Sequence, residues 1–258
     1  MKKIISLVLA LTLMCCVLSA CGSQTPQQLV SAAMEKTAAL DAMDAVMEMS
    51  ISMEMDGQSM TVPMTYEIQA TDMQSDNPKM LIGLTMKLDI AGFTTDIDMD
   101  VYSADGWAYI ASNGSGYKVK ETAMDDQLGA DASTDMIMQE LPEELLKDAE
   151  SQKNDDGTQT VTVTIDGEAF SKLYEELIDT LNSTIGTSGI SLTISDAVVK
   201  ITVKDGYISV YDMDFTMSME IEGTTVKADA SASVTYKNPG KDVTITPPAG
   251  YQDFPEMG

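Results

Sequence analysis

The sequence contains no histidine and no arginine, and its three cysteines are Cys15, Cys16 and Cys21. Without histidine there can be no Ser-His-Asp or Cys-His relay for nucleophilic catalysis, and no zinc site of the usual nitrogen and sulfur ligands. Without arginine, the bidentate clamps that bind phosphate and carboxylate groups are missing. The sequence therefore predicts a protein that is not an enzyme, with no catalytic residue, no metal site and no cofactor.

Positive charge is also scarce. Fifteen lysines stand against 41 aspartates and glutamates, so the formal net charge is −26. A surface this acidic repels nucleic acid and the anionic headgroups of a bilayer. We therefore expect no nucleic-acid partner, and any contact with a membrane must come from a covalent anchor.

The first twenty residues have the pattern of an export signal. Two lysines precede a mainly apolar stretch at 4–17, which is too short for a comfortable transmembrane helix. The stretch ends in Leu18-Ser19-Ala20-Cys21, which resembles the lipobox of bacterial lipoproteins. The resemblance implies cleavage before Cys21 and attachment of diacylglycerol and acyl chains such as palmitate at that residue. An ordinary signal peptide and an uncleaved anchor are the alternatives.

The remaining chain reads as one domain, because no Pro/Ser-rich linker divides it. Cleavage would remove Lys2 and Lys3 and leave 13 lysines against 41 acidic residues, a net charge of −28. The predicted organisation is a signal peptide at 1–20, a lipidated tether at 21–27, a single domain at 28–246 and a flexible C-terminal tail at 247–258. We predict that the protein is exported and lipid-anchored to the outer face of the cytoplasmic membrane, within the cell envelope.

Alternation of apolar and polar residues dominates this domain and indicates half-buried β-strands. From 47 to 55 every odd position is apolar and every even one polar, and alternation resumes at 60–70 after Asp56-Gly57, a strong hairpin turn. Pro63 indicates that the second strand is edge-like or has an outward-facing amide there. Tight turns between successive strands favour an antiparallel sheet with one apolar and one polar face. Further strands are expected at 80–90, 93–101, on both sides of Asp105-Gly106 and of 114–116, and at 158–165, 190–203, 207–221, 226–236 and 243–245.

Three segments have helical patterns. Thr25 can cap a helix that runs from Pro26 to about Met43. A second helix is expected from 133 or 134, interrupted near 142 and ending before Asn154, and a third from Asp166 to about 181. Because their apolar stripes must be buried, we expect these helices to pack on the apolar face of the sheet.

The lipobox, the short helix, the long alternating strands, the helical centre that carries Ile165-Asp166-Gly167-Glu168-Ala169-Phe170, and the Asp-Gly-aromatic turns together resemble Firmicute lipoproteins related to the LolA/LppX-like superfamily. The resemblance covers nearly all of the mature chain and lies in pattern, not in an active-site motif. It implies an α+β, mainly β fold: a curved antiparallel sheet, or half-barrel, with about three helices packed on its concave face. Several members of that superfamily hold lipids or acyl chains between sheet and helices.

Methionine is unusually abundant, with 21 residues in the chain. Most of them alternate on the predicted apolar face. Methionine is flexible and polarizable, so it suits either an ordinary core built with few aromatic residues or a cavity that accepts varied apolar ligands. The candidate cavity residues are Met49, Ile51, Met53, Met64, Tyr66, Leu84, Met86, Met99, Phe215, Met217 and Met219.

The densest acidic cluster is the stretch 96–100, in which aspartates alternate with apolar residues. It begins like an EF-hand calcium loop but has Val101 in place of the glycine and Trp107 in place of the closing glutamate. The alternation puts the three carboxylates on one face of a strand. A solvated face is the leading interpretation, with loose cation binding as the alternative.

Three functions remain open on these observations. One is an enzyme that uses only Asp, Glu, Lys, Ser, Thr or Tyr, for which no spacing nominates a catalytic pair. The other two are not enzymatic. The first is a membrane-anchored lipoprotein that binds or carries an apolar ligand, a lipid or an acyl chain, in a cavity between sheet and helices. The second is a non-enzymatic structural or interaction module of the cell envelope, whose protein partner the sequence does not name.

Overall fold

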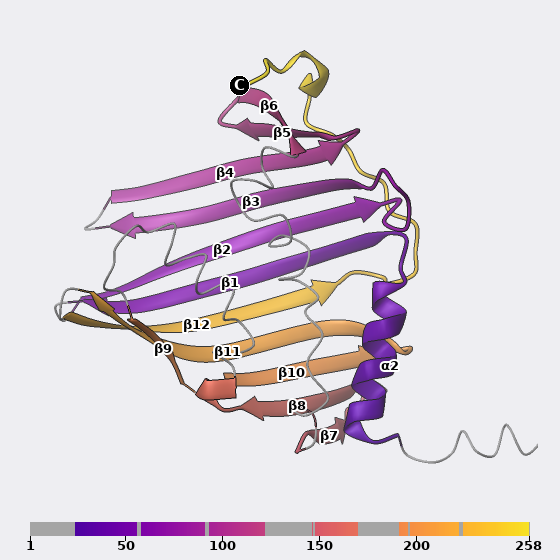
Figure 1. The fold of residues 1–258 in the computed structure, drawn as a ribbon, viewed down its shortest axis with the longest axis vertical. Helices are drawn as coiled ribbons and strands as arrows, with labels where there is room; N and C mark the ends of the chain where they lie inside the picture. Colours follow the sequence, from indigo (N-terminus) through magenta and orange to yellow (C-terminus); the bar gives the residue numbers. More distant parts are fainter. Residues whose placement is uncertain are drawn as a thin grey trace, which may run out of the picture.

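The computed structural model describes residues 24–55, 58–90, 93–121, 146, 148–169, 191–195, 197–221 and 224–257. Within these ranges the protein is mostly β, with its strands in a single sheet (Figure 1). The elements are α2 (Pro26–Ala38), β1 (Met43–Met55), β2 (Gln58–Thr71), β3 (Lys79–Ile90), β4 (Phe93–Ala104), β5 (Trp107–Ser112), β6 (Ser115–Lys120), β7 (Glu150–Lys153), β8 (Gln159–Ile165), β9 (Ser191–Ile194), β10 (Ala197–Lys204), β11 (Tyr207–Ile221), β12 (Thr224–Tyr236) and the 3-10 turn η3 (Tyr251–Asp253).

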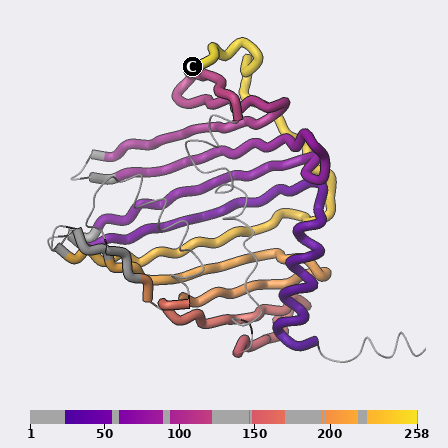
Figure 2. The backbone as a smooth tube through the Cα atoms, in the orientation of Figure 1, coloured from indigo at the N-terminus to yellow at the C-terminus, as the bar shows by residue number. Residues whose placement is uncertain are grey.

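The sheet is antiparallel, with the strand order β6-β5-β4-β3-β2-β1-β12-β11-β10-β8-β7, and β9 lies beside β11. Strands β1 to β6 form a meander on one side of β12. The first and last strands of the chain pair in the middle of the sheet, where Ala45 lies opposite Tyr236 (Figure 2). This pairing joins the two parts of the chain into one layer.

Three hairpins turn through two residues, two of them at Asp-Gly pairs as predicted. The third turns at Asn113-Gly114 and not at 114–116, because Ser115 and Gly116 belong to β6. At Asp105-Gly106 the φ angles are 54° and 77°, at Asn113-Gly114 they are 51° and 78°, and at Asp205-Gly206 they are 53° and 79°. Two successive positive φ angles define the type I′ turn, whose twist matches that of the flanking strands. Asp, Asn and Gly tolerate this left-handed conformation, so turn chemistry fixes the register of the strands on either side.

Pro63 lies in β2, a central strand, at a position where β2 pairs with β1 but not with β3. Among the described residues, β2 pairs with β3 only from Met64, opposite Met86, onward to Thr71. Pro63 lies opposite Ser50 of β1. Hydrogen-bonded and non-hydrogen-bonded pairs alternate along an antiparallel ladder, and counting from the pair Met55–Gln58 makes Ser50–Pro63 a non-hydrogen-bonded pair. The amide that proline lacks would therefore have faced β3. The edge-like character predicted for this position is confirmed.

Helix α2 starts where the sequence predicts. The Thr25 hydroxyl accepts the backbone N–H of Gln28 at 3.2 Å, and the Gln28 side chain accepts the Thr25 N–H at 3.2 Å. This capping box, followed by Pro26, satisfies the first amides of the helix.

The helix ends earlier than predicted, at Ala38 instead of about Met43. The Gln74 side chain, from the loop between β2 and β3, donates to the carbonyls of Ala38 at 3.2 Å and Leu40 at 3.3 Å. Met43 already belongs to β1, where it pairs with Ala70. Met43 fits the helical periodicity as well, but its pairing with β2 places it in a strand.

The prediction of about three helices on the sheet is wrong. In the described part of the chain, α2 is the one helix of more than a single turn. The second predicted helix was to run to Asn154, but Glu150–Lys153 is strand β7, which pairs with β8. A turn at Asn154–Gly157, closed by the Asn154 N–H donating to the Thr158 carbonyl at 2.9 Å, imposes this hairpin. The stretches 122–145 and 170–190, which hold most of the other predicted helical residues, lie outside the described residues.

Two strand predictions also need correction. The single strand expected at 190–203 is divided into β9 and β10, because β11 pairs with β9 at Met217–Glu220 and with β10 at Tyr207–Asp214. The short strand expected at 243–245 is absent, and these residues have no regular structure. Alternation alone does not show where a long strand is interrupted.

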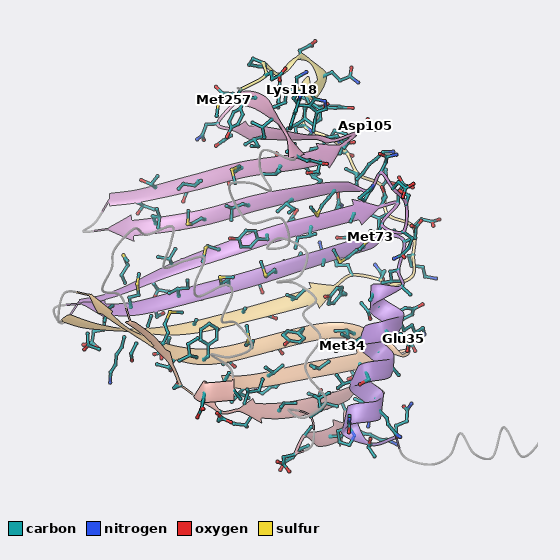
Figure 3. All side chains as sticks on the ribbon, viewed as in Figure 1. Met34, Glu35, Met73, Asp105, Lys118 and Met257 are labelled. Atoms are coloured by element: carbon teal, nitrogen blue, oxygen red, sulfur yellow. The ribbon has the colours of Figure 1, made fainter. Side chains whose placement is uncertain are left out.

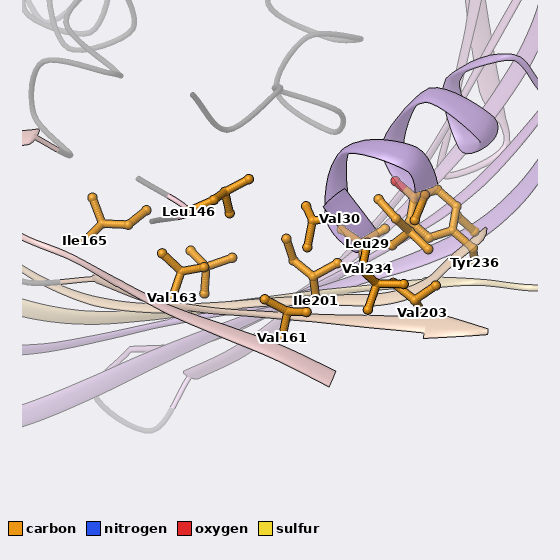
Figure 4. Close-up of a cluster of buried hydrophobic side chains, with 14 of the residues drawn as sticks. Leu29, Val30, Leu146, Val161, Val163, Ile165, Ile201, Val203, Val234 and Tyr236 are labelled. Atoms are coloured by element: carbon orange, nitrogen blue, oxygen red, sulfur yellow. The ribbon is translucent and has the colours of Figure 1, made fainter. Parts of the chain in front are cut away.

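The core lies between α2 and one end of the sheet. Leu29, Val30 and Ala33 of α2 pack against the inner residues of β8, β10 and β12, and Val30 lies over Ile201 (Figure 4). Val30 and Ile201 are fully buried. Lys36 fixes the end of the helix by donating to the Asp205 carbonyl at 2.8 Å and lying over the Tyr207 ring. Helix α2 thus covers the sheet over β10 and β11, at one end of the strands (Figure 1).

Candidate functional site

The predicted cavity residues share one face of the sheet. Met49 lies opposite Met64, which lies opposite Met86, and in the next row Tyr66 lies opposite Leu84. Directly opposed residues of an antiparallel sheet point to the same side. This is the side that α2 packs against, and we call it the helix face.

The same face continues across β12 to β11. Ile51 and Phe215 lie on either side of Ala230, and Met53 and Met217 lie on either side of Ala228. Met99 joins from β4 opposite Leu84, and the backbone of Met219 pairs with that of Val226. The structure therefore brings ten of the eleven predicted residues to one side, from five strands, and Met219 belongs to the same strand as Phe215 and Met217.

Burial divides these residues into two groups. Tyr66, Phe215 and Met217 pack against the core beneath α2. Seven others are half-buried, and sulfur-bearing side chains are spread over the sheet (Figure 3). We call this second group the methionine platform: Met49, Ile51, Met53, Met64, Leu84, Met86 and Met99.

The side chains of the platform are apolar, and polar neighbours include Ser112, opposite Met99, and Tyr66. The Tyr66 hydroxyl lies 3.9 Å from the Met64 sulfur, at the border between platform and core. Methionine side chains adopt many shapes at low cost, so such a surface adapts to ligands that differ in length or branching. The arrangement can hold an apolar molecule.

Three half-buried residues belong beside the platform although they were not among the predicted candidates. Met60 lies opposite Met53, Val62 opposite Ile51, and Ile97 opposite Met86. The signal that could have found them is the alternation itself, since each occupies an apolar position of an alternating strand.

Two hollows lie on the other face of the sheet, with volumes of about 310 and 300 Å³. Hydroxyls and carboxylates dominate both, so they differ in place and chemistry from the platform. The first is lined by Ser50, Ser52, Asp214, Phe215, Thr216, Asp229, Ala230 and Ser231. The second is lined by Thr65, Glu67, Gly83, Leu84, Thr85, Asp98, Met99, Asp100, Ala111, Ser112, Asn113 and Gly114.

The acidic stretch of β4 lies on this polar face. Asp96, Asp98 and Asp100 are exposed on the same side of the strand, as alternation predicts. Lys87 lies 3.9 Å from Asp96, and the Thr85 hydroxyl donates to Asp98 at 3.2 Å. In the ranges that the structure describes, no cluster of three or more acidic or sulfur ligands could hold a metal ion. The stretch therefore has the form of a solvated face.

The titratable groups with shifted pKa values belong to turns and packed aromatics. Hydrogen bonds from the Thr158 hydroxyl and N–H lower the pKa of Asp156, in the turn between β7 and β8. Burial raises the pKa of Tyr236 to about 12 and also raises the pKa values of Tyr102 and Tyr109. These shifts have structural causes and nominate no acid-base pair.

Cys21 and the rest of the leader lie outside the described residues, so lipidation there stays a prediction. Where the chain is described, no helix has the length and apolar character needed to cross a membrane.

Residues 25–249 match the model of a protein family described as a family of unknown function, DUF6612. The chain belongs to the DUF6612 family. The match runs from Thr25, the cap of α2, to Ala249, and so takes in every strand of the sheet. No protein of curated function is similar in sequence to this DUF6612 member.

Several solved structures match most of this chain at low sequence identity. LprF from Mycobacterium bovis is 16% identical over 87% of this chain and 97% of its own, with a TM-score of 0.46. A DUF1329 family protein from Desulfovibrio piger is 12% identical over 86% and 93%, with a TM-score of 0.26. A domain from Vibrio parahaemolyticus, described as an outer membrane lipoprotein-sorting protein, is 9% identical over 84% and 93%, with a TM-score of 0.24. The Firmicute origin implied by the sequence resemblance stays a prediction.

Proposed function

We propose that this DUF6612 protein is a lipid-anchored binding or carrier protein that holds an apolar ligand, a lipid or an acyl chain, against the methionine platform. The observation that carries the proposal is the platform itself. Seven apolar side chains from four neighbouring strands lie together on the helix face, and each is half-buried. Contiguous apolar surface that a protein leaves partly exposed commonly marks a binding site.

Energetics support an occupant for this surface. Removing apolar surface from water contributes about 25 cal/mol per Å², so a half-buried methionine or leucine gains further when a ligand covers it. In contrast, Val199 and Ile201 beneath α2 are fully buried, so a ligand could remove no further apolar surface of theirs from water. Binding energy is therefore available over the platform and not over the core.

The proposed anchor would keep the domain close to the bilayer. Four residues separate Cys21 from Pro26, the first residue of α2. At about 3.3 Å per residue they span roughly 13 Å, which is less than the width of a domain. Acylation of Cys21 would thus hold the platform near a source of lipid on the outer face of the cytoplasmic membrane. The proposal contains no catalytic step, consistent with a chain that lacks histidine and arginine.

Ligand titration tests the proposal. The full mature chain, freed of co-purified lipid, should bind a fluorescent fatty acid with defined stoichiometry. The triple variant Met49→Gln/Met64→Gln/Met86→Gln should bind at least tenfold more weakly, because three adjacent sites in one row become polar. Met257→Gln is the matched control, since Met257 is exposed at the far end of the chain. A flat titration, or equal binding by the triple variant, would reject the carrier function and favour the structural or interaction module.

The anchor has a separate test. The intact gene product should partition into the detergent phase and carry a mass increment at Cys21, whereas Cys21→Ser should lose both. Retention of the Cys21→Ser variant in the membrane without acylation would show an uncleaved signal anchor instead.

A further inference from the structure

The C-terminal residues Gly250–Met257, here called the C-terminal segment, lie along the outer edge of β6 (Figure 1). The Lys118 N–H donates to the Pro255 carbonyl at 2.9 Å, and the Met257 N–H donates to the Lys118 carbonyl at 2.9 Å. Glu256 forms a parallel bridge with Lys118. The segment therefore occupies the position that a further strand would take, in the manner of a bound extended peptide. The flexibility predicted for 247–258 stays a prediction, but these contacts give the segment a defined place.

A slot for an aromatic ring lies beside this edge. The Phe254 ring packs so closely on Gly116 of β6 that a Cβ atom at position 116 would overlap it. The neighbouring strand offers another small residue, Ala111, directly opposite Gly116. Because both residues are small, β5 and β6 leave room for the Phe254 ring at this point.

A second aromatic contact fixes the segment. Tyr251 meets Tyr102 edge-on, with ring centroids 5.1 Å apart, and Tyr109 edge-on at 4.9 Å. Tyr102 is only 5% exposed although it lies on the otherwise polar face. Edge-to-face aromatic pairs of this geometry stabilise a contact beyond what burial alone contributes. The segment is therefore recognised by ring contacts as well as by its backbone.

Charge is complementary at the same place. β6 carries Lys118 and Lys120, both lying over the Trp107 ring, in a chain whose net charge is −26. The C-terminal segment carries Asp253 and Glu256, and the backbone of Glu256 bridges that of Lys118. An acidic peptide is attracted here and repelled by most of the remaining surface.

The connection to the segment is long and irregular. Residues 237–249 form neither helix nor strand, and they lead from β12, in the middle of the sheet, to β6 at its end. Six strand spacings of about 4.8 Å separate β12 from β6, roughly 29 Å, whereas thirteen residues reach up to about 43 Å. The link is therefore longer than the distance it must span. Pro247-Pro248 favours an extended backbone within it.

We propose that the β6 edge, with the Gly116 slot and the tyrosine pair, is a peptide-docking site that takes the C-terminal segment of a second copy in an exchanged dimer. The chain's own segment fills the site at low concentration, because its tether raises its effective concentration. The same contacts form between copies when protein concentration rises. Each copy then gives its segment to the other and receives one in return, so the exchange closes as a symmetric dimer. Salt promotes exchange, since it screens the repulsion between two strongly acidic chains.

Complementary variants test this in the full chain. Gly116→Val blocks the slot but leaves a competent segment, whereas Phe254→Ala weakens the segment but leaves an open slot. Each variant alone should be monomeric in native mass spectrometry, and their mixture should form a heterodimer joined through one exchanged segment. Wild-type chain should dimerise increasingly with concentration and with salt.

A direct probe covers the case in which Gly116→Val fails to fold. A labelled peptide of residues 247–258 should bind the full-length Phe254→Ala chain, shift the emission of Trp107, the one tryptophan, and bind at least tenfold more weakly when its own phenylalanine is alanine. Absence of peptide binding, or a wild-type chain that stays monomeric at all concentrations and salt levels, would overturn the proposal. Neither result bears on fatty-acid binding at the platform, which lies on the other face.

Discussion

The Thr37 hydroxyl on α2 accepts the backbone N–H of Ile208 on β11 at 3.0 Å. The same hydroxyl donates to the Ala33 carbonyl at 2.7 Å, and the Thr37 side chain is 2% exposed. One buried oxygen therefore serves as donor within the helix and as acceptor from the sheet. This contact fixes where the last turn of α2 meets the strands, and so sets how much of the helix face the helix leaves uncovered.

Replacing this hydroxyl should destabilise the domain. Thr37→Val keeps the side-chain shape but leaves the Ile208 amide buried without its acceptor, which costs about 1–3 kcal/mol. Urea unfolding should show a lower midpoint with an unchanged slope. Thr37→Ser keeps the hydroxyl and should lose less. Equal stability of the Val and wild-type proteins would show that this hydrogen bond does not hold the helix.

Gly116→Ala should release Phe254, because the added Cβ overlaps its ring. We expect faster proteolysis near the C-terminus and a changed Trp107 emission, while the sheet keeps its circular dichroism. Gly83→Ala is the matched control, since a Cβ there would lie 3.3 Å from a carboxylate oxygen of the exposed Asp100 side chain, which can move. A C-terminus as protected in Gly116→Ala as in Gly83→Ala would contradict the slot.

Stability should fall at alkaline pH partly through Tyr236. Burial raises its pKa to about 12, whereas the unfolded value is near 10. Because folding favours the protonated phenol, the stabilisation is complete below pH 10 and is lost as pH rises to 12. Two pKa units correspond to about 2.7 kcal/mol at most. Urea titrations between pH 8 and pH 12 should show a shallower decline for Tyr236→Phe, and an identical decline would refute the assignment.

The turn at Asp105-Gly106 should tolerate asparagine better than alanine. Gly106 has a φ of +77°, and a Cβ there would meet no atom within 4 Å, so any cost comes from the backbone conformation. Gly106→Ala should cost about 1 kcal/mol, and Gly106→Asn should recover part of it, because Asn enters the left-handed region more readily. Thermal unfolding of the two variants measures the difference. Indistinguishable midpoints would mean that the hairpin relaxes.

The sequence predicts best what short-range chemistry decides. The turns at Asp105-Gly106 and Asp205-Gly206, most of the alternating strands and the capped start of α2 each depend on a few neighbouring residues, and these are found where predicted, whereas Asp56-Gly57 lies outside the described residues. The common face of Met49, Met64 and Met86 follows from alternation once the hairpins are known.

Long-range pairing decides what the sequence did not predict. Helical periodicity continues into residues that the turn at Asn154–Gly157 draws into β7, and only pairing with β11 shows the break between β9 and β10. Contact between Phe254 and Gly116 joins the end of the chain to a strand far earlier. A glycine within an alternating strand was the one local sign of it.

The pairing of Ala45 with Tyr236 has a consequence for biogenesis. β1 is synthesised early, whereas its partner β12 is completed near the end of the chain, and contacts so distant in sequence form slowly. Until then the early meander carries an unsatisfied, methionine-rich border open to aggregation. A chaperone that covers β1 during that interval would therefore raise the yield of folded protein.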